Sequence, residues 1–126
     1  MKYLVAAILI LSCVLAFCIF SFYKLDSAVG ELLNIIASAE ESASSGDMEK
    51  SYEYTKTAVS LWTDKEILFA ALLNHDQFNN IPANLEGMLR CSEEGSKSGL
   101  LSYLITLRAD LEQIISDETL TLKNLF

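Results

Sequence analysis

The sequence predicts an all-α protein in which an N-terminal transmembrane helix continues into an antiparallel four-helix (helical-hairpin) bundle with an extended C-terminal tail. Residues 3–23 carry no charge and are almost wholly apolar. The segments after them place large apolar side chains at spacings of three and four, the pattern of amphipathic helices. Only short breaks separate these segments, as between antiparallel neighbours in a bundle. We therefore expect a membrane anchor at 1–24, an acidic helical-bundle domain at 25–116 and an extended apolar tail at 117–126.

The charges lie almost entirely outside the apolar run. The 126 residues include 9 Lys and Arg against 17 Asp and Glu, which gives a net charge of -8. All 17 acidic residues lie from Leu25 onward, together with only 7 of the basic ones. A nucleic-acid binder needs a cationic surface, so this class is excluded. A disordered chain is not expected either, because 52% of the residues are hydrophobic.

The apolar run is long enough to cross a bilayer. As a helix at about 1.5 Å per residue it would span roughly 30 Å, with Tyr3 and Tyr23 at its ends, where amphipathic rings favour the headgroup layer. A cleaved signal peptide would be shorter and would need small residues where Phe20–Tyr23 stand. A lipoprotein signal would end at Cys13, yet more apolar residues follow it. These features favour an uncleaved, single-pass helix in the cell membrane.

Flanking charges predict the orientation. Lys2 and the terminal amine precede the run and Lys24 follows it, which favours an N-terminus in the cytoplasm and a domain outside. Cys13 and Cys18 lie within the run, so Cys91 is the only thiol of the domain. No intramolecular disulfide is therefore expected in the domain.

Apolar stripes define the helices in order. The first helix is predicted over 3–44, where its bundle half carries the stripe Leu25, Val29, Leu32, Ile36, Ala39 and Ala43. Asp47 is the predicted N-cap of a second helix over 48–73, whose apolar face includes Trp62 as a core residue. A third helix carries Phe78, Ile81, Leu85, Met88 and Leu89.

Two breaks complete the domain. Pro82 must lie in the first turn of the third helix or kink it, because its nitrogen carries no proton. Residues 92–99 are predicted to be a loop before a fourth helix with the stripe Leu100, Leu104, Leu107, Leu111 and Ile114. A faint similarity between residues 45–50 and 94–97 leaves two stacked helical hairpins open, and an up-down bundle is the default.

The tail changes character. Leu120 and Leu122 alternate with threonines, and the chain closes on Leu125 and Phe126. We expect an extended arm that folds back into a groove between helices, with Asn124 bonding to free backbone groups. The alternative is an extended docking motif for a partner. The candidate interaction or tail-docking residues are Trp62, His75, Leu120, Leu122, Asn124, Leu125 and Phe126.

No pattern of catalytic or metal-binding residues is recognisable. His75 is the only histidine, and its neighbour Asp76 would point about 100° away on a helix. One histidine, one domain cysteine and scattered acids do not make a ligand set. We therefore assign no catalytic, cofactor-binding or metal-binding residue and expect no cofactor. His75 is expected at a helix cap or on the surface, and a small hydrolase that acts through it is the third-ranked function.

These features together resemble a known family. The N-terminal apolar helix, the acidic helical domain and the closing residues 120–126 are similar to an uncharacterised family of small membrane proteins from Gram-positive, often spore-forming bacteria, domain of unknown function number four-three-six-three. Its most specific parts here are Trp62, the stretch His75–Phe78 with Ile81, and Leu120–Phe126. Gln77 and Asn79 stand where members carry acids, which argues against a charge-dependent site. The resemblance implies location and length but no reaction.

The expected function is therefore not enzymatic. We expect a membrane-anchored, extracytoplasmic helical protein with a protein-interaction or scaffolding role in the bacterial cell envelope. Its partners would be the lipid bilayer and another envelope or integral membrane protein, without nucleic acid. The alternative is a small-molecule or ion sensing domain coupled to its membrane helix, with a pocket lined by Trp62 and Tyr54.

Overall fold

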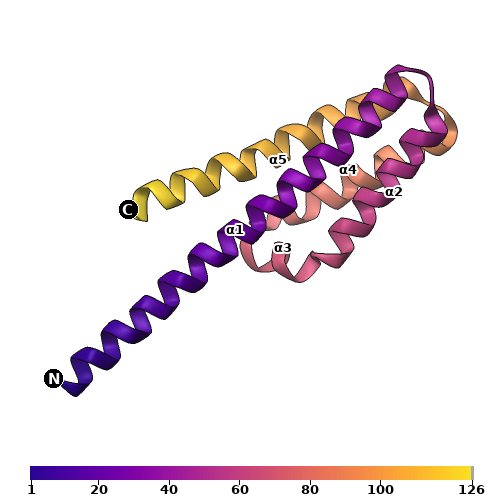
Figure 1. The fold of residues 1–126 in the computed structure, drawn as a ribbon. Helices are drawn as coiled ribbons and strands as arrows, with labels where there is room; N and C mark the ends of the chain where they lie inside the picture. Colours follow the sequence, from indigo (N-terminus) through magenta and orange to yellow (C-terminus); the bar gives the residue numbers. More distant parts are fainter. Residues whose placement is uncertain (126) are drawn as a thin grey trace.

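The chain folds into an all-helical bundle. The computed structural model describes residues 1–125, apart from the side chains of Leu122 and Leu125. Its helices are α1 (Lys2–Ser44), α2 (Met48–Asp64), α3 (Glu66–Leu72), α4 (His75–Glu94) and α5 (Lys97–Leu125), shown in Figure 1. No strand occurs among the described residues. The all-α prediction is confirmed.

α1 has two halves with different surroundings. It is one helix of 43 residues, and its N-terminal half projects from the bundle (Figure 1). Large apolar side chains of residues 3–23 are exposed, and the buried residues of α1 begin at Leu25. The predicted boundary near residue 24 therefore marks a change from exposed to buried side chains within an unbroken helix.

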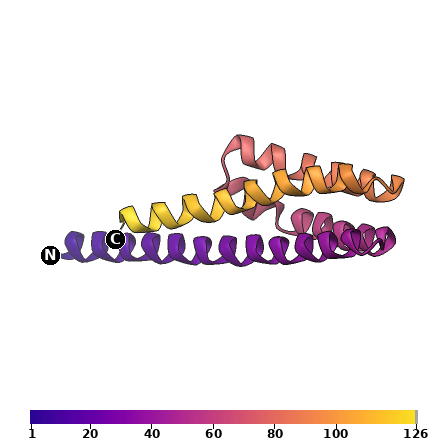
Figure 2. The ribbon, with the colours of Figure 1, turned by 90° about the horizontal axis from the view of Figure 1, so that it is seen from above.

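Four long helices enclose the core. α1 packs against α2 and α5, and α4 packs against α2 and α5, so the four form a closed ring of neighbours. Figure 2 shows α5 lying along α1 over much of its length. The predicted stripes of α1 and α5 supply most of the buried apolar residues, which are Leu25, Ala28, Val29, Leu32, Ile36, Ala39, Ala43, Ala58, Trp62, Phe69, Ile81, Leu85, Met88, Leu100, Leu104, Leu107, Leu111 and Ile114.

Local signals end and begin the helices. Asp47 is the N-cap of α2 as predicted, because its side chain accepts a hydrogen bond of 3.0 Å from the backbone N–H of Lys50. α4 begins with a capping box formed by Asn74 and Gln77. The C-cap that follows α4 is Gly95, whose φ of 73° is a left-handed conformation that glycine adopts without strain.

The predicted second helix is divided in two. α2 ends at Asp64 and α3 begins at Glu66, so the expectation of one helix over 48–73 is wrong. Residues seven apart in a straight helix lie about 10 Å apart along its axis. The rings of Trp62 and Phe69 nevertheless stack with centroids 4.4 Å apart. The break at Lys65 shortens the path between them and allows this stacking.

The predicted loop at 92–99 is also shorter than expected. α4 extends to Glu94 and α5 begins at Lys97. Gly99 lies inside α5, where a Cβ would be 2.8 Å from Sγ of Cys91. The absence of a side chain at Gly99 therefore allows α5 to approach α4 closely. Pro82 lies well inside α4, beyond its first turn, and α4 continues past it.

Residues 117–125 are helical, so the expectation of an extended arm at 117–126 is wrong over the described part of the tail. α5 continues through Leu125 without a break at 117. The Thr119 and Thr121 hydroxyls donate hydrogen bonds of 2.9 Å to the carbonyls of Ile115 and Asp117, one turn earlier. No glycine or proline follows Gly99, so nothing local ends the helix. Phe126 lies outside the described residues.

Candidate functional site

The candidate site lies between α1 and α5, at the end of the bundle from which the apolar half of α1 projects. Two adjoining hollows form it, and we call them together the Glu118 crevice. The small hollow, of about 80 Å³, is lined by Phe22, Leu25, Leu72, Leu73, Gln77, Ile114, Asp117, Glu118 and Thr121. The large hollow, of about 280 Å³, is lined by Ile19, Phe22, Tyr23, Asp26, Glu118 and Thr119. Glu118 lines both hollows.

Glu118 is an unusual carboxyl group. The residue is only 7% exposed, and its Oε2 has no hydrogen-bond partner among the residues that the structure describes. Burial disfavours the charged form and, with a smaller contribution from the nearby Asp26 carboxylate, raises the pKa of Glu118 from 4.5 to about 7. The group can therefore gain or lose a proton close to neutral pH.

The groups that face Glu118 do not neutralise its charge. α1 contributes Asp26 and Tyr23, α4 contributes Gln77, and α5 contributes Asp117. The Gln77 amide donates to Asp117 at 3.4 Å, and the Gln113 amide donates to the other oxygen of Asp117 at 2.9 Å. Among the described residues that line the two hollows there is no lysine, arginine or histidine.

The sequence analysis missed Glu118, although a signal for it exists. The stripe Leu100, Leu104, Leu107, Leu111 and Ile114 reaches Glu118 at its next step of four. A carboxyl group at a core position is the informative exception to the rule that charged residues are exposed. The signal was lost because the predicted fourth helix stopped before residue 117.

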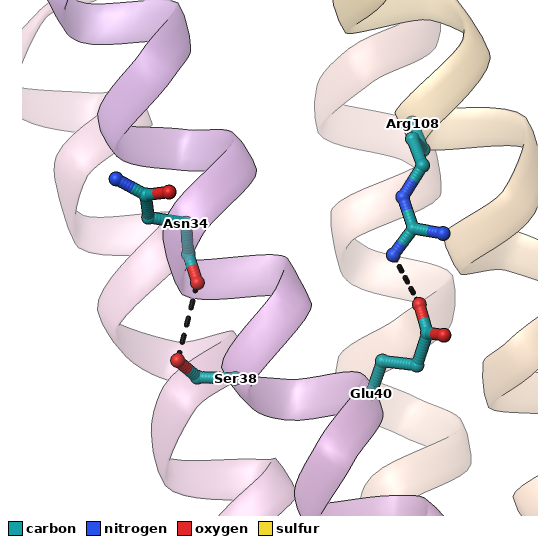
Figure 3. Close-up of polar contacts among 4 residues, drawn as sticks. All are labelled: Asn34, Ser38, Glu40 and Arg108. Atoms are coloured by element: carbon teal, nitrogen blue, oxygen red, sulfur yellow. Dashed lines mark hydrogen bonds and ion pairs between the residues drawn. The ribbon is translucent and has the colours of Figure 1, made fainter.

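Polar contacts fix α5 against its neighbours along its length. Arg108 of α5 donates from Nη2 to Oε2 of Glu40 on α1, an ion pair drawn in Figure 3. The same view shows the Ser38 hydroxyl, which donates to the carbonyl of Asn34 at 3.1 Å within α1. The Asn84 amide of α4 donates to Asp110 of α5 at 3.4 Å. The ion pair and the Asn84–Asp110 hydrogen bond lie where α5 packs against α1 and α4.

Trp62 is a core residue and lies away from the Glu118 crevice. It is 6% exposed, stacks on Phe69, and lies 5.7 Å from the Phe78 ring, centroid to centroid. Tyr54 lines a polar hollow with Asp47 and Lys50 near the opposite end of α1, and Trp62 is not part of that lining. The structure thus does not bring Trp62 and Tyr54 to one pocket.

His75 is exposed at the first position of α4. Its Nε2 lies 3.1 Å from the amide nitrogen of Asn79 one turn later. No group of three or more His, Cys, Asp or Glu side chains with metal-binding geometry occurs in the described part of the chain. Cys13, Cys18 and Cys91 are all free.

Leu120, Leu122, Asn124 and Leu125, four of the candidate residues of the tail, lie on the last turns of α5. Leu120 is 57% exposed, and Asn124 is exposed as well. The side chains of Leu122 and Leu125, and the whole of Phe126, lie outside the described residues. The tail therefore carries exposed groups next to the Glu118 crevice.

Comparison with known proteins yields one match. The sequence pattern of a protein family described as "Domain of unknown function (DUF4363)" matches residues 19–125. No curated protein and no solved structure matches the chain. The matched region contains all of the Glu118 crevice and the last residues of the apolar run.

Proposed function

The chain belongs to the family of the domain of unknown function DUF4363, and from this premise we propose that it is a membrane-anchored, non-enzymatic interaction protein of the bacterial cell envelope. In this proposal residues 3–23 span the cytoplasmic membrane with the N-terminus inside. The acidic bundle stands outside and binds another envelope or integral membrane protein.

The observation that carries the proposal is the continuity of α1. One helix of 43 residues joins an exposed apolar half to the buried stripe of the bundle. This apolar half is long and apolar enough to cross a membrane, and by length and composition alone a signal sequence would pass the same test. Leaving it in water would forgo about 25 cal/mol for each Å² of apolar surface, which a bilayer would cover.

Two further observations favour an anchor over a cleaved signal. Ile19, Phe22 and Tyr23 line the large hollow together with Thr119 of α5, so the end of the apolar run is part of the folded bundle. The family match also begins at residue 19, inside the run. Cleavage after the run would remove these contacts.

The unbroken helix also supports a scaffolding role. With no flexible linker at residue 24, the bundle would stand at a fixed height and orientation above the bilayer. Its net charge makes a basic partner surface the complementary one. Ile67 and Ile105 are exposed apolar side chains on α3 and α5, at 88% and 65%, and such side chains suit contact with a protein.

Protease accessibility and crosslinking test this proposal. Protease added to intact, wall-stripped cells should digest the bundle and leave a membrane fragment that ends near Tyr23. A photoreactive residue at Ile67 or Ile105 should give a discrete adduct with a membrane protein, whereas one at the exposed, acidic position Glu112 should not. A bundle protected until the membrane is dissolved would reverse the orientation. Adducts at none of these positions would contradict the interaction role.

A second candidate function has its own observation. The buried carboxyl of Glu118, whose Oε2 has no partner among the described residues, lies where α5 meets the membrane helix, which favours the sensing of protons by a domain coupled to that helix. The test is the carboxyl ¹³C titration of Glu118 in the full chain in detergent micelles, with Glu118→Gln to assign the signal. We expect a midpoint at about 7. A midpoint near the ordinary value of 4.5 would reject proton sensing.

A further inference from the structure

The end of α5 lies beside the last residues of the apolar run. Thr119 lines the same hollow as Ile19 and Tyr23, and Thr121 lines the same hollow as Phe22. All three of these α1 residues belong to the uncharged run of residues 3–23. In Figures 1 and 2, α5 passes the connection between α3 and α4 and continues toward the N-terminal end of α1.

The level of this segment follows from helix geometry. Tyr23 is the last residue of the run, so Thr119 lies at the level of its final turn. Residues 120–125 continue α5 by about 9 Å more, at about 1.5 Å per residue. Because α5 runs toward the N-terminal end of α1, these residues extend past the level of Tyr23 and reach the outer edge of the hydrocarbon core, just beneath the headgroup layer.

The described side chains suit this boundary of the bilayer. Leu120 is 57% exposed, and Ile19 and Phe20 on α1 are exposed apolar side chains as well. Lys123 and Asn124 are exposed, and the hydroxyls of Thr119 and Thr121 are satisfied by their own helix. Lys123 is the only basic residue after Arg108 in a domain that is otherwise acidic. Basic side chains near the membrane are attracted to anionic headgroups.

We propose that residues 119–125 at the end of α5 form a second membrane contact, lying beside α1 at the boundary between the headgroups and the outer acyl chains, with Leu120 toward the acyl chains and the Lys123 side chain extended to the phosphates. The inference rests on the proposed function, in which residues 3–23 span the bilayer. The occupant is lipid because this face is continuous with the exposed apolar surface of α1. Two contacts on different helices would prevent the bundle from rotating or tilting freely about α1.

Site-directed fluorescence quenching in vesicles tests the proposal. The full chain, with its three cysteines replaced by alanine, receives one new cysteine that carries an environment-sensitive fluorophore. The three positions are Leu120→Cys, Ile105→Cys and Leu11→Cys, whose native side chains are similarly exposed at 57%, 65% and 60%. The vesicles contain phosphatidylcholine and phosphatidylglycerol, with or without lipids brominated on the acyl chains. Circular dichroism establishes that each labelled chain is helical.

The three positions separate the outcomes. We expect a label at 11 to lose most of its fluorescence to brominated lipid, a label at 105 to lose none, and a label at 120 to show an intermediate loss. Quenching at 11 without quenching at 120 would overturn the second contact and leave the membrane span intact. No quenching at 11 would overturn the span, and the second contact with it. Equal quenching at 105 and 120 would mean that the bundle lies flat on the bilayer, and would overturn the proposed geometry.

A charge reversal tests whether Lys123 contacts the anionic phosphates of the headgroups. Lys123→Glu should reduce quenching at position 120 in vesicles that contain phosphatidylglycerol and change it little in vesicles of phosphatidylcholine alone. Thr106→Lys, at an exposed position far from the end of α5, is the matched control and should leave quenching unchanged. An identical loss of quenching in both kinds of vesicle would overturn the role of Lys123 at anionic phosphates. Quenching at position 120 that occurs in lipid vesicles but is lost in native membranes would assign this face to a protein instead.

Discussion

Gly87 of α4 lies directly against the ring of Tyr103 on α5, so that a Cβ at residue 87 would be 2.6 Å from Cε1 of Tyr103. Atoms of real side chains do not approach so closely. Gly87 is buried, and the Tyr103 ring is half-buried and packed on the core. The contact sets how closely α4 and α5 approach, and it predicts that a single methyl group there disturbs the bundle.

Gly87→Ala should lower the free energy of unfolding by about 1–2 kcal/mol, because overpacking costs about 1–3 kcal/mol and the gain in helix propensity returns about 1 kcal/mol at most. Urea unfolding followed by the fluorescence of Trp62 measures it. Gly30→Ala is the matched control, since a Cβ at residue 30 of α1 meets nothing within 4 Å. The free energy of unfolding of this control should rise, because alanine has the higher helix propensity. Equal stabilisation of both variants would contradict the close contact.

Trp62→Ala should lower the free energy of unfolding by about 3–5 kcal/mol, because it removes a buried ring from the cluster with Phe69 and Phe78. Thermal unfolding followed by circular dichroism measures the change. Ile67→Ala removes a side chain that is 88% exposed, so it should change stability by less than about 0.5 kcal/mol. A Trp62→Ala variant as stable as the Ile67→Ala variant would exclude a structural role for the ring.

Glu118→Gln should change how stability depends on pH. The pKa of Glu118 is raised to about 7 in the folded chain, so the folded state holds the proton more tightly than the unfolded state does. The stabilisation linked to this proton is complete below pH 4.5 and is lost as the pH rises through about 7. Glutamine does not titrate, so in the variant the free energy of unfolding should no longer fall by this amount as the pH rises. Urea unfolding at a series of pH values measures the slope of the free energy of unfolding against pH.

Two control variants identify the cause of that pH dependence. Glu112→Gln changes an exposed carboxyl on the same helix and should leave the slope between pH 4.5 and 7 unchanged. Asp26→Asn removes the neighbouring charge, the smaller of the two causes, and should narrow the pH range of the decline without abolishing it. If Glu112→Gln flattened the slope as much as Glu118→Gln, the buried group would not be its source.

The ion pair of Glu40 and Arg108 should contribute little stability. Both side chains are more than one third exposed, at 37% and 36%, so water screens their attraction. A double-mutant cycle with Glu40→Gln and Arg108→Gln should give a coupling energy below about 1 kcal/mol. Added salt should reduce it further. A coupling of several kcal/mol that salt does not change would show that the pair is effectively buried.

Local pattern alone determined most of the helices. The uncharged run of residues 3–23 and the stripe from Leu25 to Ala43 predicted one helix that the structure confirms almost residue for residue. Asp47 marked the start of α2, because an N-cap acts within three residues along the chain. Such features depend on neighbours in sequence, so they can be read without knowing which helices pack together.

The tertiary structure decided what depends on the partner helix. The break at Lys65 allows Trp62 to stack on Phe69, a contact between two helices that no local pattern predicts. The threonine-leucine alternation near the end of α5 resembled an extended strand, although the segment is helical. Above all, Glu118 became a buried carboxyl only because α5 extends back along α1 to Asp26 and Phe22. Whether a side chain loses water depends on which surface lies opposite, and in this chain that surface is supplied by residues almost a hundred positions away.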